Sequence, residues 1–471
     1  MAGLLIFIAS ALMLVGGYMV YSRLAERIYG FNTAMQMPCE KLHDVVDYVS
    51  MPSWRVFMIQ LLNIAGLGPV FGALSGCLFG PVCLVWIVLG CILAGAVHDF
   101  MAAMASAERD GENLPEFIGR QLGKSALVVM RSLCILLMLL VGVVFTTGPA
   151  GMLHELVNSV STLWWCAVIL LYYILATILP IDVIIGKIYP VFGALFLCMA
   201  VSIAFLLPFS GYEIMPVTDF ITNMHPDHLS VWPMLFVTIA CGAISGFHAT
   251  QSPMMVRCLS SAKNMRPVFY GAMITEGLVA LIWAVAGMTL RDVIGLAEVT
   301  PPVAVNKICS LLLGPGGAVL AVLGVVVLPI TSGDTAMRCC RLMVADALKI
   351  NQKNQLNRLW VALPLFALVV FIANLDFKII WRYFGWANQT LACFTLWAIA
   401  VLLKTRGRFH WMVSLPAFFM TNVCISFLLC SPDCLNILSV GVATMISFAI
   451  STAFFLFFLV RYKPDHEKLS S

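Results

Sequence analysis

Apolar stretches about as long as a membrane crossing recur along the whole chain, separated by short polar connections. A helix needs about 20 mostly apolar residues to cross a bilayer, so the pattern predicts about thirteen transmembrane helices. They are expected to begin near Gly3, Val56, Val82, Ser125, Thr162, Ile188, Val231, Pro267, Val303, Leu359, Phe377, Trp411 and Leu435. The predicted fold is therefore an all-α polytopic membrane protein.

Two of these apolar stretches are interrupted. Residues 57–79 contain the run NIAGLGP at 63–69, and residues 231–247 end in ACGAISG at 240–246. Glycine and proline at such points free backbone N–H and C=O groups, which lipid cannot hydrogen-bond, so the groups must face protein, water or a bound solute. Two discontinuous helices in separate halves of a chain are typical of the substrate site of a secondary transporter.

Composition supports a membrane protein and excludes other classes. Of the 471 residues, 61% are hydrophobic and 11% are charged, more apolar surface than a soluble domain can hide. The net charge of +4 is small, and no basic stripe with interleaved aromatic residues indicates a nucleic-acid partner. The 16 cysteines form no CxxC pairs, so no cofactor or metal site is predicted. Cys430 and Cys434 flank a short connection, where free thiols are expected rather than a bridge.

The distribution of Lys and Arg predicts an orientation. Connections rich in basic residues, such as 109–124 and 338–358, alternate with connections at 148–161 and 208–230 that hold no Lys or Arg. Cytoplasmic loops carry the excess of basic residues. Together with an odd number of crossings, this places the N-terminus outside and the C-terminus in the cytoplasm.

This topology also predicts internal symmetry. The first broken helix would run outward and the second, five helices later, inward, which is the relation between two inverted five-helix repeats. We expect the repeats at residues 54–210 and 231–405, with peripheral helices at 1–30 and 411–460. Because no connection approaches the ~50 residues that a soluble domain needs, residues 1–471 are expected to form one transporter domain.

Ionisable side chains inside apolar helices are rare and costly, so each is a functional candidate. Asp99, next to His98, lies toward the cytoplasmic end of the third predicted helix, and Glu276 lies about two turns into the eighth. Asp99 is a coupling-ion candidate or an acid that reaches the membrane interface. Glu276 is a candidate proton carrier or a buried structural acid. Asp182, in a predicted loop after Pro180, is expected to be a solvated cap.

The run LPITSGDT at residues 328–335 is expected to close the ninth helix. Pro329 removes a backbone donor, which leaves carbonyl oxygens free beside Thr331, Ser332 and Asp334. Oxygen ligands of this kind suit Na⁺, or a proton on Asp334. These three residues are the first choice for the coupling-ion site, and a frayed helix end is the alternative interpretation.

Substrate is expected at the two breaks, where helix N-terminal amides can hold a carboxylate. The run GFHATQSP at 246–253 adds polar side chains after the second break, with Pro253 expected to start a new helical piece; a capped cytoplasmic turn is the alternative. Arg382 could attract an anion at the outer mouth, although its aromatic neighbours are also typical of an interfacial belt. The predicted substrate-binding residues are Asn63, Gly66, Gly68, Ser245, His248, Thr250 and Gln251.

Several runs of residues resemble the carbon starvation proteins (CstA-like). The matching runs are IAGLGP within residues 63–72, LAGAVHDF at 93–100, SGFHATQSPM at 245–254, RPVFYGAMITE at 266–276, TSGDTA at 331–336 and IWRYFGWANQTLA at 380–392. They extend from the second to the eleventh predicted helix. One departure is the run IQLL at residues 59–62, where the family often carries two histidines.

The resemblance implies a bacterial inner-membrane secondary transporter with a LeuT-like core, in a family linked to proton-coupled pyruvate uptake and to peptide uptake under carbon limitation. The substrate would be pyruvate or a short peptide, and the coupling ion H⁺ or Na⁺. A rival from another class is an intramembrane aspartyl-type hydrolase with Asp99 and Asp334 as a dyad. It would leave both helix breaks without a role, so we expect a transporter and not an enzyme.

Overall fold

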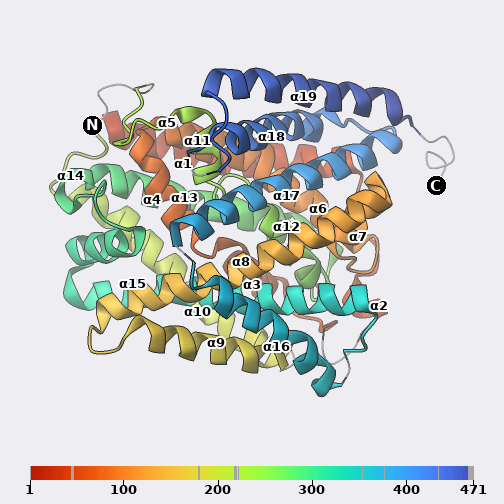
Figure 1. Cartoon of the computed structure of the whole chain (residues 1–471), viewed down its shortest axis with the longest axis horizontal. Helices are drawn as coiled ribbons and strands as arrows, with labels where there is room; N and C mark the ends of the chain where they lie inside the picture. The colour runs from red at the N-terminus through yellow and green to blue at the C-terminus, as the bar shows by residue number, and fades with distance from the viewer. Residues whose placement is uncertain are drawn as a thin grey trace.

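The computed structural model describes residues 2–43, 47–178, 181–216, 220, 222–352, 354–375, 377–432 and 434–464. The side chain of Asp182 lies outside the described residues. The described chain is helical (Figure 1). The helices are α1 (Ala2–Tyr29), α2 (Pro38–Lys41), α3 (Ser53–Ala65), η1 (Gly68–Gly72), α4 (Ala73–Gly76), η2 (Cys77–Phe79), α5 (Val82–Val85), η3 (Trp86–Gly95), α6 (Ala96–Ala107), α7 (Leu114–Leu122), α8 (Lys124–Leu156), α9 (Thr162–Ile178), α10 (Ile181–Leu206), η4 (Leu207–Phe209), α11 (Val231–Thr238), α12 (Gly246–Val256), η5 (Ala262–Asn264), η6 (Arg266–Tyr270), α13 (Gly271–Thr289), α14 (Arg291–Ile294), α15 (Pro301–Leu348), α16 (Gln355–Ile372), α17 (Phe377–Thr405), α18 (Trp411–Cys430) and α19 (Val440–Arg461).

Many of these helices are long and apolar enough to cross a membrane. Within the described residues there are 10 such helices, or 11 with α3 and its continuation counted as one bent span, and α9 is a shorter apolar helix. Most begin close to the expected positions. The exceptions are α10, which begins at Ile181 rather than near Ile188, and α19, which begins at Val440 rather than near Leu435.

The helices lie side by side, with the two ends of the chain at opposite ends of the bundle (Figure 1). The first and last helices are peripheral in burial. Only 17% of the apolar stretch of α1 and 22% of that of α19 are buried, against 78% for Ile379–Thr405 in α17. The broken helices α3 and α12 lie among the central helices, and α12 packs against α3, α6 and α17. The interior of the bundle therefore contains both helix breaks.

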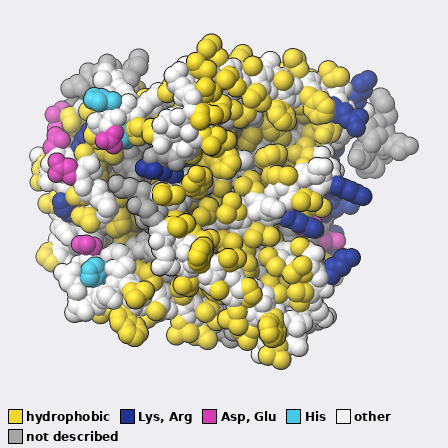
Figure 2. Space-filling model, viewed as in Figure 1, with side chains coloured by type: hydrophobic (Ala, Val, Ile, Leu, Met, Phe, Trp, Pro, Cys, Tyr) yellow, Lys and Arg dark blue, Asp and Glu magenta, His cyan; other side chains and the backbone are white. Residues whose placement is uncertain are grey.

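The surface has the character of a membrane protein. Hydrophobic side chains cover most of the face shown in Figure 2, while most of the visible Lys and Arg gather at the end where the C-terminus lies. Leu163, Trp360 and Val460 are each more than 70% exposed. A soluble monomer rarely exposes so extended an apolar surface, so these side chains are expected to face lipid.

Two expectations about helix ends were wrong. Residues 328–335 do not close a helix, because α15 continues through them from Pro301 to Leu348. The Pro329 carbonyl accepts a hydrogen bond from the Tyr173 hydroxyl (3.2 Å), so α9 contacts α15 at the proline. Pro253 does not start a helix but lies inside α12. Cys430 and Cys434 are not joined by a disulfide, as expected.

Candidate substrate and ion sites at the helix breaks

The first helix break follows from glycine at two positions. Gly66 has φ +47°, a conformation that other residues rarely adopt, and it ends α3. The helix resumes at η1 with a bend of 52° between the two pieces. A Cβ atom at Gly68 would overlap the Cβ and Sγ atoms of Cys241, so glycine here lets the first break touch the second. The predicted interruption of this helix is confirmed.

The second break lies between α11 and α12, where Gly242 has φ +92°. Its freed backbone groups find partners on other helices. The Ile239 carbonyl accepts a hydrogen bond from Trp86 Nε1 (2.9 Å), and the Phe247 N–H donates to Asn388 Oδ1 (2.7 Å). This interruption is also confirmed, but one N-terminal amide of α12 is already occupied by α17.

A small cavity lies where the two breaks meet. It has a volume of about 90 Å³. Gly68 and Gly72 of the first break, Cys241 of the second and Arg382 of α17 line it. The other lining residues are Leu229, Met234, Val237, Thr238, Ala240, Trp381, Phe384, Gly385, Phe427, Ser431 and Pro432. We call this space the break cavity.

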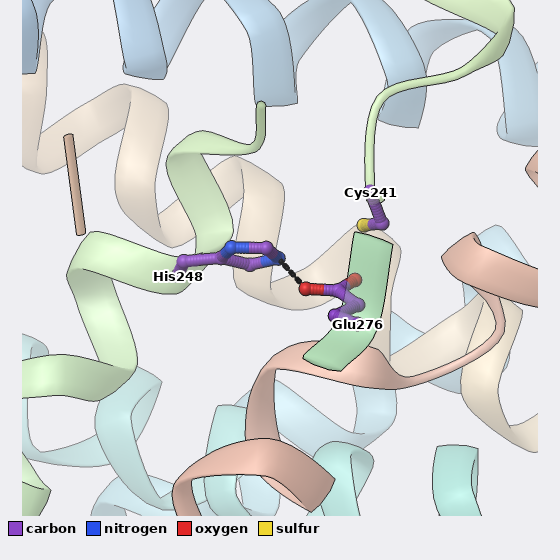
Figure 3. Close-up of side chains that lie close together, drawn as sticks. All are labelled: Cys241, His248 and Glu276. Atoms are coloured by element: carbon purple, nitrogen blue, oxygen red, sulfur yellow. Dashed lines mark ion pairs between the residues drawn. The ribbon is translucent and has the colours of Figure 1, made fainter. Parts of the chain in front are cut away.

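Beside the break cavity is a group of buried polar side chains, the His248 cluster, which consists of Asp99, Cys241, His248 and Glu276. All four are buried and come from α6, the second break, α12 and α13. Asp99 Oδ2 lies 2.9 Å from His248 Nδ1, and Asp99 Oδ1 lies 2.7 Å from His98 Nδ1. On the other edge of the imidazole, His248 Nε2 lies 3.5 Å from Glu276 Oε2 (Figure 3).

Several atoms of the His248 cluster lack hydrogen-bond partners among the described residues. They are His248 Nε2 and both carboxylate oxygens of Glu276. The contact of 3.5 Å between them is close enough for an ion pair but does not meet the geometry of a hydrogen bond. Leaving a buried polar group without a partner costs about 1–3 kcal/mol, and more when it is charged. These groups are therefore available to a ligand.

The second polar group, the Asp334 cluster, consists of Tyr189 on α10 and Thr331, Ser332 and Asp334 on α15. The Tyr189 hydroxyl donates to Asp334 Oδ2 (2.8 Å). Ser332 Oγ donates to the carbonyl of Leu62 in the last turn of α3 (2.7 Å), and Thr331 Oγ1 donates to the Leu328 carbonyl (2.8 Å). The cluster thus connects α15 to the first helix break, and Asp334 Oδ1 is buried without a described partner.

The remaining predicted residues fall into two groups. Asn63, in α3, has both amide atoms buried without a described partner. Ser245, Thr250 and Gln251 bond within the protein. Ser245 Oγ donates to Asn388 Oδ1 (3.0 Å), Thr250 Oγ1 donates to a backbone carbonyl and Gln251 Nε2 donates to Thr250 Oγ1 (2.9 Å). Their role in substrate binding stays a prediction.

Sequence reasoning missed three residues of these sites. Cys241 is one of the cysteines for which the lack of CxxC pairs predicts no metal site, although its position inside the run ACGAISG is a signal of a different role. Asn388, which caps α12, lay in a segment interpreted as aromatic belt. No feature of the sequence identifies Tyr189 as a site residue, because only the packing of α10 on α15 brings it to Asp334. Asp99 and Asp334 have different partners in separate clusters, so the geometry gives no support to an aspartyl dyad.

Comparison with known families decides the broader identity. The family described as carbon starvation protein CstA matches residues 2–162, 149–310 and 295–426. This chain belongs to the CstA family. A membrane protein of Haemophilus influenzae is 38% identical over 330 residues, which cover 59% of this chain and 89% of that protein.

Several CstA-family relatives carry functional names, of two kinds. The peptide transporter CstA of Helicobacter pylori J99 is 27% identical over 64% of this chain and 53% of its own length. The pyruvate/proton symporter BtsT of Escherichia coli K12 is 25% identical over 64% of this chain and 51% of its own length. The matched region is thus about half of each of these two relatives.

Solved structures show the same fold. The structure of Mhp1, a nucleobase-cation-symport-1 family transporter in a closed conformation with bromovinylhydantoin bound, aligns with a TM-score of 0.56 and 13% identity. The alignment covers 91% of this chain and 98% of Mhp1. The predicted all-α fold of a polytopic transporter is therefore confirmed, whereas the thirteen helices and the inverted repeats stay predictions. The family and its structural neighbours point to a transporter rather than an enzyme.

Proposed function

We propose that this protein is a secondary active symporter that imports a small carboxylate such as pyruvate, together with H⁺, across the bacterial inner membrane during carbon limitation. The observation that carries the proposal is the break cavity, which places Arg382 and the glycines of the first break around one small space. Planar guanidinium groups recognise carboxylates well, and glycine lets a solute approach the backbone closely.

The size of the break cavity supports a small substrate. Its volume of about 90 Å³ is well below the roughly 300–1,000 Å³ of pockets that enclose drug-sized ligands. A solute with a few non-hydrogen atoms is matched better than a peptide. Peptide uptake is the second candidate, because a relative is named as a peptide transporter.

The coupling proposal rests on charge and on the Asp334 cluster. Moving a carboxylate inward against a negative interior costs about 2.3 kcal/mol per charge per 100 mV, unless positive charge accompanies it. Asp334 is buried, has one open oxygen and sits on the helix whose Ser332 contacts α3. We propose that Asp334 carries the proton and that Ser332 and Thr331 link its state to the first break.

The topology proposal follows the predicted boundaries. Residues 54–210 and 231–405 form two inverted five-helix repeats within thirteen transmembrane helices, and residues 1–30 and 411–460 are peripheral. The N-terminus is outside and the C-terminus is cytoplasmic. The gathering of Lys and Arg at the end with the C-terminus supports this orientation, because basic residues mark the cytoplasmic side (Figure 2).

Counterflow in proteoliposomes tests the substrate. Vesicles containing the purified protein are loaded with unlabelled pyruvate or an unlabelled dipeptide and diluted into a trace of the labelled form. We expect transient accumulation of label with pyruvate and none with the dipeptide. Accumulation of the dipeptide alone would replace the proposal by peptide transport, and the absence of counterflow with both would remove it.

A further inference from the structure

We propose that Cys241, His248 and Glu276 form a binding site for one divalent transition-metal ion of the zinc class. The three side chains come from the second helix break, α12 and α13 and point toward one another (Figure 3). Their sulfur, nitrogen and oxygen ligand atoms all lie within 4.8 Å of one another, and all three residues are buried. This site is independent of the proposed proton carrier, Asp334.

The spacing of two ligand atoms already fits a bound metal. Zinc binds nitrogen and oxygen ligands at about 2.0–2.2 Å and sulfur at about 2.3 Å, so ligand atoms around a tetrahedral ion lie roughly 3.4–3.6 Å apart. His248 Nε2 and Glu276 Oε2 are 3.5 Å apart. Neither atom has a hydrogen-bond partner among the described residues. An ion between them and Cys241 Sγ would satisfy both.

The surroundings have the arrangement that metal-binding histidines need. A ligating histidine usually bonds to a carboxylate through its other ring nitrogen, which fixes the tautomer and aims the free lone pair at the metal. Asp99 Oδ2 occupies that position at 2.9 Å from His248 Nδ1, and His98 holds the second oxygen of Asp99. Asn388 Nδ2 approaches Cys241 Sγ (3.9 Å), where it can donate to a thiolate.

The donor set defines the class of ion. Thiolate and imidazole select borderline and soft ions such as Zn²⁺ and Co²⁺, whereas Na⁺ and Mg²⁺ prefer oxygen ligands. The Cys241 thiol loses its proton to solvent on binding. A thiolate and the Glu276 carboxylate then balance the two charges of the ion. Three protein ligands leave one coordination position open, and Cys241 also lines the break cavity.

Cobalt binding to the purified full-length protein tests the proposal. Co²⁺ is added to metal-free protein in lipid nanodiscs, and the sulfur-to-cobalt charge-transfer absorption is followed. We expect saturation at one ion per chain and reversal by Zn²⁺. Cys241→Ser should remove the charge-transfer band, and His248→Gln and Glu276→Gln should weaken binding. Asp99→Asn should weaken it by about 10–100-fold, as is typical of residues that orient a ligand.

The matched control is Cys393→Ser. Cys393 is also buried but lies on α17, where its Sγ is 3.0 Å from Thr421 Oγ1 of α18. This variant should keep the band. The proposal would be overturned if wild-type protein showed no saturable Co²⁺ binding, or if the sulfur-to-cobalt band persisted in Cys241→Ser. If Cys241→Ser does not elute as a folded protein in size exclusion, Glu276→Gln decides: unchanged cobalt affinity in that variant contradicts the site.

Discussion

The two buried polar clusters differ in how far their polar atoms are hydrogen-bonded within the protein. In the His248 cluster, ligand atoms of His248 and Glu276 converge beside a helix break and have no hydrogen-bond partners in the described part of the chain. In the Asp334 cluster, hydroxyl groups of Tyr189, Ser332 and Thr331 donate to a carboxylate or to backbone carbonyls. A broken helix leaves space for a ligand, whereas the part of α15 that follows its kink at Gly314 runs without a break through Asp334 and holds this carboxylate buried.

The difference suggests separate tasks. The His248 cluster has buried nitrogen and oxygen atoms without partners among the described residues, and its Cys241 lines the break cavity. This arrangement suits recognition of a solute or ion. The second joins α15 to α10 and to the last turn of α3 through single hydrogen bonds. A proton on Asp334 would change one of these bonds and so bias the position of the first break.

The largest effect is expected from filling the contact between the two breaks. In Gly68→Leu the new side chain would overlap Cys241 and enter the break cavity. Pyruvate uptake in proteoliposomes should fall at least about 100-fold, because a shift of 2.7 kcal/mol in the barrier suffices for that. Gly441→Leu is the control, since a Cβ there meets nothing within 4 Å. Normal uptake by Gly68→Leu would show that substrate does not pass this point.

Neutralising Asp334 should separate accumulation from exchange. Asn resembles the protonated acid, so Asp334→Asn should lose pyruvate accumulation driven by a pH gradient while keeping exchange of substrate present on both sides. The two assays are run on the same vesicles. Loss of both activities would instead indicate a ligand of a cation such as Na⁺, and retention of accumulation would exclude Asp334 as the carrier.

Removing the partner of Asp334 should have an intermediate effect. Tyr189→Phe deletes the hydroxyl that donates to Asp334 Oδ2. Hydrogen bonds to charged groups contribute about 1.5–3 kcal/mol, so we expect roughly tenfold slower accumulation with exchange largely intact. Tyr172→Phe is the comparison, because the Tyr172 hydroxyl lies 3.4 Å from the Tyr189 hydroxyl, whereas Tyr189 donates directly to the acid. Equal rates in Tyr189→Phe and wild type would show that this bond does not bear on coupling.

The smallest effect is expected at Thr250. Its hydroxyl donates to the Phe247 carbonyl and accepts from Gln251, both within α12. A neutral internal hydrogen bond contributes about 1 kcal/mol, so Thr250→Val should change the KM for pyruvate by less than about fivefold. A rise in KM of more than about 50-fold would place Thr250 in direct contact with substrate.

The sequence predicted the helices and both breaks because these depend on local features. Apolar length marks a span, and Gly66 and Gly242 mark points where a helix cannot continue. The sequence identified Asp99, His248 and Glu276 as candidate site residues but did not predict that they form one cluster. Contacts between α6, α12 and α13 depend on the packing of segments that are far apart in the sequence. The continuation of α15 through Pro329 was missed for the same reason, since a proline does not by itself end a helix that packs against several neighbouring helices.

The most direct test of the central claim is proton flux during pyruvate entry. Proteoliposomes enclosing a pH-sensitive dye are placed in Na⁺-free buffer, with the membrane potential clamped at zero, and pyruvate is added outside. We expect internal acidification at about one proton per labelled pyruvate taken up, absent from protein-free vesicles and strongly reduced in Asp334→Asn. Pyruvate entry without acidification, or entry that requires Na⁺, would contradict proton-coupled carboxylate import.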